Sequence, residues 1–377
     1  MTNDQESILD KIISTQQVSH REHFLPQAAL RQLLETLGER ERQVITRRFG
    51  LTGAEPETLE SIGRSFQVTR ERIRQIQRLA ATKLTQGRAN QETVRMVRQV
   101  VSEVLEAEGG AATEVKLGRL LAEAGDTSNL NVLQFYLGEL LTDVVAPVGG
   151  EGTDLMPGWR LRSAAVAALS ALITRAQDLT STRGTPQPAA ELAAELARAN
   201  LPAPLGGTLT DGKVILNLLE LARHVRSNTF GEWGLTHWET VTPRRMNDKI
   251  YLVLKKHGSP LHFRDITRLI NEAAFDHKVA YPPTVHNELI MDKKYVLVGR
   301  GIYALKEWGF RPGVVADILV DILKSRGEPM HRDELVTELL KQRLVKKGTI
   351  HLALTNRKRF ERLPDGRYTV PSATPAR

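Results

Sequence analysis

The amino-acid sequence predicts a mainly α-helical protein, in which a helix-turn-helix is followed by tandem winged-helix modules of three helices and a β-hairpin each. Two observations predict this fold class. Apolar residues recur mostly with the helical period of about 3.6, and alternating strand patterns are few. In addition, a unit of helical stretches that ends in a short glycine-bearing segment recurs roughly every 65–80 residues, which is the size of a small domain.

The glycine-bearing segments that close these units predict the β-hairpins, or wings. Gly299-Arg300-Gly301 and Pro364-Asp365-Gly366 supply turn residues, and Val, Ile, Tyr and Thr flank them, as is typical of hairpins. Boundaries at Thr242-Pro243 and Arg311-Pro312-Gly313 separate neighbouring units. The closing segments comprise residues 144–161, 225–241, 295–305 and 360–370.

These signals divide the chain into consecutive parts. We expect an N-terminal helical segment at 1–30, a helix-turn-helix at 31–87 and a tail at 373–377. Four modules lie between the helix-turn-helix and the tail, and we name them the first to the fourth winged-helix module. They span residues 88–163, 164–242, 243–312 and 313–372.

The helix-turn-helix is predicted from local signals. Residues 36–49 and 59–65 have helical patterns, and a loop at 50–58 joins them. A turn at Phe66-Gln67 leads into a helix over 69–84, with the hydroxyl of Thr69 as its N-cap. One stripe of this last helix is apolar and is predicted to be buried. The stripe consists of Ile73, Ile76, Ala80 and Leu84.

The opposite face of the 69–84 helix carries long hydrogen-bonding side chains. Arginine can bridge O6 and N7 of guanine or bind a phosphate, glutamine can bridge N6 and N7 of adenine, and glutamate can accept from the amine of cytosine. The second helix of a helix-turn-helix enters the major groove of DNA with its N-terminus first. An amphipathic helix with solvated charges gives a similar pattern, so two interpretations remain open. The side chains are Arg70, Glu71, Arg74, Gln75 and Arg78.

The net charge of +8 is unevenly distributed along the chain. Counted over residues 243–312 and 313–377, the C-terminal third carries +6 and +5, whereas the first and second modules carry −4 and −1. A basic surface favours a polyanionic partner, nucleic acid first, and a net negative surface opposes approach to DNA. We therefore expect the first two modules to bind protein or to set spacing.

The order of residues in the helix-turn-helix adds to this interpretation. Residues 37–84 closely resemble region 4, the last conserved region of the primary sigma factors of bacterial RNA polymerase. The stretches RRFGL, TLESIG and VTRERIRQI match that family in order and spacing. The resemblance implies that this part docks on the β flap of the RNA polymerase core and reads the upstream promoter element in double-stranded DNA.

The resemblance also implies roles for individual residues. Arg70, Glu71 and Gln75 would contact bases, and Thr69 would begin the helix near a phosphate. Gln77 and Leu79 depart from the family, which commonly has charged residues at these positions. Two further residues would lie on or beside the groove, namely Arg74 and Arg78.

The part of a sigma factor that melts promoter DNA uses a cluster of aromatic residues on a helix. Residues 1–36 contain a single aromatic residue, Phe24. We therefore expect the chain to act at transcription initiation without melting promoter DNA by that family's route.

The third module resembles a second family. The stretches LHFRDITRLI and GRGIYAL, within residues 243–310, resemble the HARE helix-turn-helix family, a winged-helix family that includes the N-terminal domain of the RNA polymerase delta subunit of some bacteria. Members occur in transcription, chromatin and restriction contexts, so the resemblance implies biology linked to DNA rather than one activity.

The fourth module has basic residues on both sides of its predicted third helix and in its wing. A basic third helix and a basic wing suit contacts with DNA phosphates. The alternative is that the third and fourth modules bind protein or act as spacers with solvated charges. The flanking residues are Lys346, Lys347, Arg357, Lys358 and Arg359, and the wing adds Arg362 and Arg367.

Several functional classes are not favoured by the sequence. The absence of cysteine excludes disulfides, zinc–thiolate sites and a cysteine nucleophile. His20 and His23 have no third metal ligand nearby, and Gly149-Gly150-Glu151-Gly152 does not fit a phosphate-binding loop. No GxSxG motif occurs. We expect no catalytic activity, no cofactor and no metal.

Membrane and secretion signals are likewise not found. The longest nearly apolar stretch, residues 164–173, is too short to span a bilayer, and the polar N-terminus does not fit a signal peptide. We expect a cytoplasmic, nucleoid-associated bacterial protein without membrane contact.

These observations predict a sequence-specific DNA-binding transcription factor. Its expected partners are promoter-like double-stranded DNA and the RNA polymerase core. One alternative is a protein-interaction adaptor or accessory subunit of the polymerase, in which DNA contact is incidental. A further alternative, which rests on the family of the third module alone, is a DNA-targeting module of a restriction or defence system.

Overall fold

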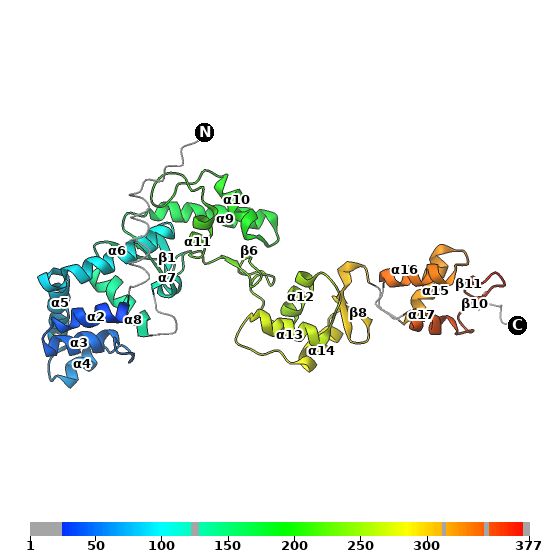
Figure 1. The fold of residues 1–377 in the computed structure, drawn as a ribbon, viewed down its shortest axis with the longest axis horizontal. Coiled ribbons are helices and arrows are strands. Elements are labelled where there is room, and N and C mark those ends of the chain that lie inside the picture. The colour runs from blue at the N-terminus through cyan, green and yellow to red at the C-terminus, as the bar shows by residue number, and fades with distance from the viewer. Residues whose placement is uncertain (1–24, 122–127, 311–313, 343–346, 372–377) are drawn as a thin grey trace. The chain divides into compact units, whose positions relative to one another are not determined.

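The computed structural model describes residues 25–121, 128–310, 314–342 and 347–371. In this part of the chain the protein is mainly helical with small sheets, as predicted (Figure 1). The described residues form two compact units. The N-terminal unit comprises the described residues up to Arg226 together with Trp233–Thr236, and the C-terminal unit comprises Ser227–Glu232 and the described residues from His237 onward.

The helix-turn-helix contains the three predicted helices, preceded by a helix that begins inside the predicted N-terminal helical segment. The sequence predicts one helix over 36–49, but Thr36 closes the preceding helix by donating its hydroxyl to Leu33 O at 2.7 Å. Gly38 is the N-cap of the next helix and donates its N–H to Glu41 Oε2 at 3.1 Å. The helices are α2 (Pro26–Glu35), α3 (Glu39–Phe49), α4 (Leu59–Ser65) and α5 (Arg70–Gln86).

The first winged-helix module follows in the N-terminal unit. Its three strands form one antiparallel sheet in the order β1-β3-β2. The helix η2 is a π-helix that continues α8 directly. The elements are η1 (Arg88–Asn90), α6 (Gln91–Ala107), β1 (Ala111–Thr113), α7 (Glu114–Leu121), α8 (Ser128–Phe135), η2 (Tyr136–Leu140), β2 (Val145–Val148) and β3 (Gly158–Leu161).

The second module repeats this order of elements. A helix, a short strand, two helices and a hairpin follow one another, and the three-stranded sheet has the order β4-β6-β5. The elements are α9 (Val166–Arg183), β4 (Gln187–Pro188), α10 (Ala189–Ala197), α11 (Gly212–Leu219), β5 (Val225–Ser227) and β6 (Glu232–Leu235).

The third module, in the C-terminal unit, has the same order of elements. Its antiparallel sheet has the order β7-β9-β8, and Gly301 in the wing has a φ of 70°. The elements are α12 (Met246–His257), β7 (Leu261–His262), α13 (Phe263–Ala273), α14 (Pro282–Met291), β8 (Tyr295–Gly299), β9 (Ile302–Leu305) and η3 (Lys306–Trp308).

The fourth module keeps the plan in reduced form. Met330 takes the place of the first strand, because it pairs with Tyr368 in an isolated bridge beside the wing. The elements are α15 (Val315–Arg326), α16 (Arg332–Gln342), α17 (Lys347–Leu354), β10 (Glu361–Arg362) and β11 (Tyr368–Thr369). The recurring order of elements agrees with the predicted winged-helix plan.

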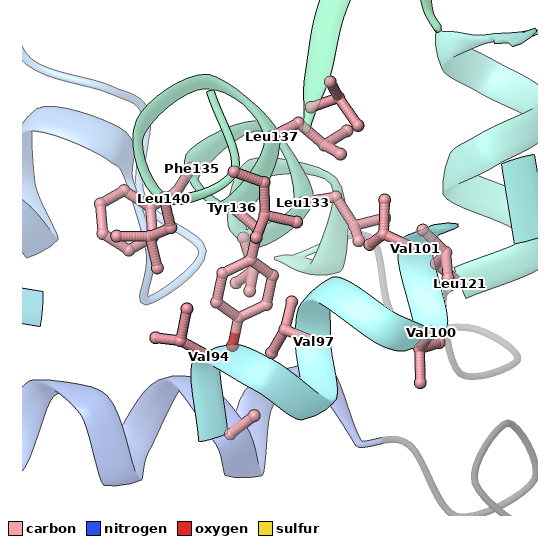
Figure 2. Packing of buried hydrophobic residues seen from close by; sticks show 14 of the residues in the cluster. Val94, Val97, Val100, Val101, Leu121, Leu133, Phe135, Tyr136, Leu137 and Leu140 are labelled. Atoms are coloured by element: carbon pink, nitrogen blue, oxygen red, sulfur yellow. The ribbon is translucent and has the colours of Figure 1, made fainter. Parts of the chain in front are cut away.

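The predicted division of the chain into parts stays a proposal. The boundary between residues 30 and 31 falls inside α2, and one hydrophobic cluster joins α2, α3 and α5 to the first module. Figure 2 shows part of this cluster, in which Val94 and Val97 of α6 lie beside Tyr136 of η2. Residues 1–24, the boundary at 311–313 and the tail at 373–377 lie outside the described residues.

Candidate nucleic-acid interface

The helices α4 and α5 pack around a small apolar core. Ile62, Ile73 and Ile76 are buried in it together with Val44 of α3. A Cβ at Gly63 would lie 2.8 Å from Val68 O, so only glycine allows this close approach of the turn to α4. The predicted turn at Phe66-Gln67 is confirmed, and Gln67 adopts a left-handed conformation with a φ of 55°.

Threonine hydroxyls cap both helices of the motif. Thr69 Oγ1 accepts from the N–H of Arg72 at 3.2 Å, which confirms the predicted N-cap of α5. Thr58 Oγ1 accepts from the N–H of Ser61 at 3.1 Å at the start of α4. Each helix of the motif therefore begins at a side-chain cap.

The two faces of α5 have the predicted polarity. The apolar stripe that contains Ile73, Ile76, Ala80 and Leu84 is buried. On the opposite face four of the five candidate side chains are exposed, and Arg74 is half-buried. We name this surface the recognition face, and it consists of Arg70, Glu71, Arg74, Gln75 and Arg78.

Hydrogen bonds hold part of the recognition face in place. Arg74 Nε donates to Glu71 Oε2 at 2.7 Å, and Arg74 Nη2 donates to the other carboxylate oxygen. Arg74 is the main cause that lowers the pKa of Glu71, so this carboxylate stays ionised and accepts only. Gln75 Oε1 accepts from Arg72 Nη1 at 3.1 Å. No ion pair within the described residues involves Arg70.

An ion pair that the sequence did not predict links α3 to the other helices of the motif. Arg47 donates to Glu57 through Nε at 2.7 Å and through Nη2 at 2.8 Å, and its Nη1 donates to Ser65 Oγ at 2.7 Å. Arg47 thereby links α3 to the loop before α4 and to the end of α4. The guanidinium groups of Arg40 and Arg47 also lie 5.4 Å and 5.7 Å from the ring centroid of Phe66.

The candidate residues of the fourth module flank its third helix. Lys347 is exposed at the start of α17, whereas Lys346 lies outside the described residues. Arg357, Lys358 and Arg359 lie in the turn between α17 and β10, not on a helix. The helix α17 itself contains only Lys347 and His351 as basic residues, and the other described candidates follow it in the chain, in the flanking position that the sequence indicates.

Two of the candidate arginines of the fourth module have acidic partners. Arg359 forms an ion pair with Asp317 of α15 and lowers the pKa of that carboxyl. In the wing, Arg367 Nη2 lies 2.6 Å from Asp365 Oδ2. Among the described residues, no ion pair involves Lys347, Arg357, Lys358 or the wing residue Arg362, and all four side chains are exposed.

The other candidate motifs of the sequence are a glycine-rich segment and a pair of histidines. Gly149, Gly150 and Gly152 lie in the turn of the first wing between β2 and β3. In the ranges that the structure covers, no group of three His, Asp or Glu residues could hold a metal ion. Within the same ranges, no helix is both long enough and apolar enough to cross a membrane. His20 and His23 lie outside the described residues.

Comparison with known families gives an independent match for the helix-turn-helix. Residues 33–86 match the model of the family described as sigma-70, region 4. This match confirms the resemblance of residues 37–84 and covers α3, α4 and α5 completely. The resemblance of residues 243–310 to the HARE family stays a prediction. Sigma-70 region 4 is a DNA-binding, non-catalytic domain, and the match indicates that this segment has a role in DNA binding and transcription.

Proposed function

We propose that this protein is a sequence-specific, sigma-factor-like DNA-binding transcription factor that acts with bacterial RNA polymerase at initiation. The observation that carries the proposal is the exposed recognition face of α5, within the segment that matches sigma-70 region 4. Its arginine and glutamine side chains have the donors and acceptors that base edges in the major groove require.

In this proposal α5 enters the major groove with its N-terminus first. Arg70 has no ion-pair partner among the described residues, so it can bind guanine or a phosphate without breaking a bond. Glu71 accepts from a cytosine amine while Arg74 holds its carboxylate in position. Gln75 exchanges its bond with Arg72 for a bidentate contact with adenine. Thr69 places the start of the helix beside a phosphate.

The fourth module supplies contacts without sequence preference. Lys347, Arg357 and Lys358 are exposed and bind DNA phosphates. Arg359 contributes only if its ion pair with Asp317 opens. Because each neutralised phosphate releases a counterion, the affinity of the whole chain for DNA falls steeply as the salt concentration rises.

Base reading is tested with the full chain on DNA sites selected from a random library. Replacing Arg70 or Gln75 by Ala should cost about 1–3 kcal/mol on the preferred site and relax the choice of sequence. Arg95→Ala, an exposed arginine of α6, is the matched control and should change neither quantity. An equal loss of affinity on preferred and scrambled DNA would rule out base reading.

The polymerase partner is tested by purifying the tagged protein from its native cells after nuclease treatment. Retention of the RNA polymerase core supports the transcription role, and variants of the β flap then test the docking site. Loss of polymerase, with DNA still bound in untreated lysate, contradicts the polymerase part and leaves α5 as a free-standing DNA reader.

A second candidate function is a protein-interaction adaptor, and one observation favours it. The third helix of the third module, α14, has an exposed face without Lys or Arg. Such a face suits protein contact better than phosphate contact. If the adaptor function is correct, neutralising Arg70, Arg74 and Arg78 leaves the affinity for DNA unchanged.

A further inference from the structure

We propose that the first winged-helix module holds α5 in its orientation, and that Glu139 of this module is a positioning residue that acts on α5 through Gln77. This inference rests on the proposed DNA-reading role of α5. It assigns a role to an acidic module for which the charge distribution predicts only spacing or protein binding.

The third helix of the first module is directed to the helix-turn-helix. Tyr136 Oη of η2 donates to Pro26 O of α2 at 2.8 Å, and both groups are buried. The ring centroids of Phe135 and Phe49 of α3 lie 5.0 Å apart. Asn131 Nδ2 of α8 donates to Gly50 O, which follows α3, at 3.2 Å. These contacts cover the third helix of the module, which is the helix that contacts DNA in DNA-binding winged-helix domains.

The helix η2 contacts α5 through a polar bond and an apolar cluster. Gln77 Nε2 donates to Glu139 Oε1 at 3.1 Å, and both side chains are half-buried. Burial raises the pKa of the Glu139 carboxyl, and the bond from Gln77 and the charge of Arg48 oppose this rise. The bond joins residues 62 positions apart in the sequence, so it depends on the tertiary packing alone.

The apolar stripe of α5 is divided between two cores. Ile73 and Ile76, in its first half, belong to the small core of the helix-turn-helix. Ala80 and Leu84, in its second half, belong to the cluster that contains Tyr136 of the first module. The helix is therefore anchored at one end by the small core of its own motif and at the other end by a cluster that the first module shares with α2 and α3. Gln77 lies where the two anchors meet.

Gln77 cannot contribute to DNA binding as a direct contact in this arrangement, because its amide faces η2 rather than the recognition face. Removal of its bond leaves every side chain of the recognition face in place. A change in DNA sequence preference would therefore reflect the orientation of α5, and a merely structural role would change thermal stability alone.

The test uses the full chain with the variants Gln77→Ala, Glu139→Ala, their combination and Glu139→Gln. The readout is the ratio of the dissociation constants for scrambled and preferred DNA. We expect each alanine variant to lower this ratio by about threefold to tenfold, as the loss of one hydrogen bond would. The double variant should lose no more than one single variant, because the two residues act through one bond. Glu139→Gln keeps an acceptor for Gln77 and should retain the ratio.

The matched control breaks a polar pair of the same module away from α5. Arg98→Ala removes the ion pair between Arg98 Nη1 and Asp143 Oδ2, which are 2.7 Å apart. The control should leave the ratio unchanged. Unchanged ratios for Gln77→Ala and Glu139→Ala would overturn the positioning role while the proposed DNA reading stands.

A second readout does not need DNA. Amide hydrogen exchange in the second half of α5 should become faster in Gln77→Ala and Glu139→Ala, and it should stay unchanged in Arg98→Ala and Glu139→Gln. If the wild-type protein shows no sequence preference, the proposed function fails and exchange still decides whether Glu139 holds α5. Unchanged exchange in both alanine variants would overturn the inference.

Discussion

The helices α5 and α14 occupy equivalent positions in their domains but present opposite chemistry to solvent. Each is the last helix of a three-helix group, α3–α4–α5 or α12–α13–α14, and each buries an apolar stripe. Ile73 and Ile76 are buried in the first group, and Val285 and Leu289 are buried in the second. The helices are therefore held in the protein by the same physical means.

Their outer faces differ in charge. The recognition face of α5 contains three arginines, whereas the exposed positions of α14 include Thr284, Asn287, Ile290 and Met291. Ile290 and Met291 are 62% and 82% exposed, so this face is apolar where that of α5 is charged. The shared helical plan therefore does not decide which helix suits contact with DNA. The residues on the outer face decide it.

The largest expected effect comes from removing the arginines that distinguish α5 from α14. Replacing Arg70, Arg74 and Arg78 by Ala should weaken binding to the preferred DNA site by about 3 kcal/mol or more, which is a factor of about 100 or more in the dissociation constant. Fluorescence anisotropy at one fixed salt concentration measures this loss.

The matched variant on the other helix replaces Asn287, Ile290 and Met291 by Ala. It should leave the affinity for DNA unchanged, because none of these side chains binds phosphate by charge. If both triple variants weaken DNA binding equally, the assignment of DNA reading to α5 and not to α14 is wrong.

A second prediction concerns the buried apolar stripe that both helices have. Ile73→Ala and Leu289→Ala each remove a buried side chain and should lower the free energy of unfolding by about 2–5 kcal/mol. Denaturant unfolding monitored separately for the two units measures each cost. A cost near zero for one of the two variants would show that the helices are not anchored in the same way.

The smallest expected effect concerns pH and the contact of α5 with the first module. Burial raises the pKa of Glu139 above its ordinary value of 4.5, so the folded protein binds this proton more tightly than the unfolded chain does. The resulting stabilisation is present below pH 4.5 and is lost as the pH rises through the raised folded value. The stability of Glu139→Gln relative to the wild type should therefore increase with pH.

Denaturant titrations of both proteins at several pH values between about 4.5 and 7 measure this trend. Glu106→Gln, on the exposed face of α6, is the matched control. A stability difference between the wild type and Glu139→Gln that stays constant over this pH range would contradict the raised pKa.

Local signals in the sequence were sufficient for much of α5. The spacing of Ile73, Ile76, Ala80 and Leu84 identified the buried stripe, and Thr69 identified the N-cap. These features depend on residues within one or a few turns of a helix, which is why they can be predicted without a fold. The predicted helix at 36–49 begins about three residues too early, although Gly38 and Glu41 supplied a capping signal.

Features that depend on distant partners were not predicted. The pairing of Arg47 with Glu57 and of Arg359 with Asp317 joins residues 10 and 42 positions apart, and no periodic pattern specifies such a pair. The docking of α8 and η2 did leave a signal in the sequence. The stretch LNVLQFYLGELL is apolar around most of the helix, and such a helix is typically buried.

The sequence by itself determined the two faces of α5, its N-cap and the recurring order of helices and strands, because these follow from helical period and local hydrogen bonding. Only the tertiary structure decided which third helix faces solvent. The spacing of apolar residues predicts that a stripe is buried, but it does not identify the element that packs on the stripe. The helix α5 packs against the first module on one side, and its arginine face stays exposed. The helices α8 and η2 of that module are buried in the same contact.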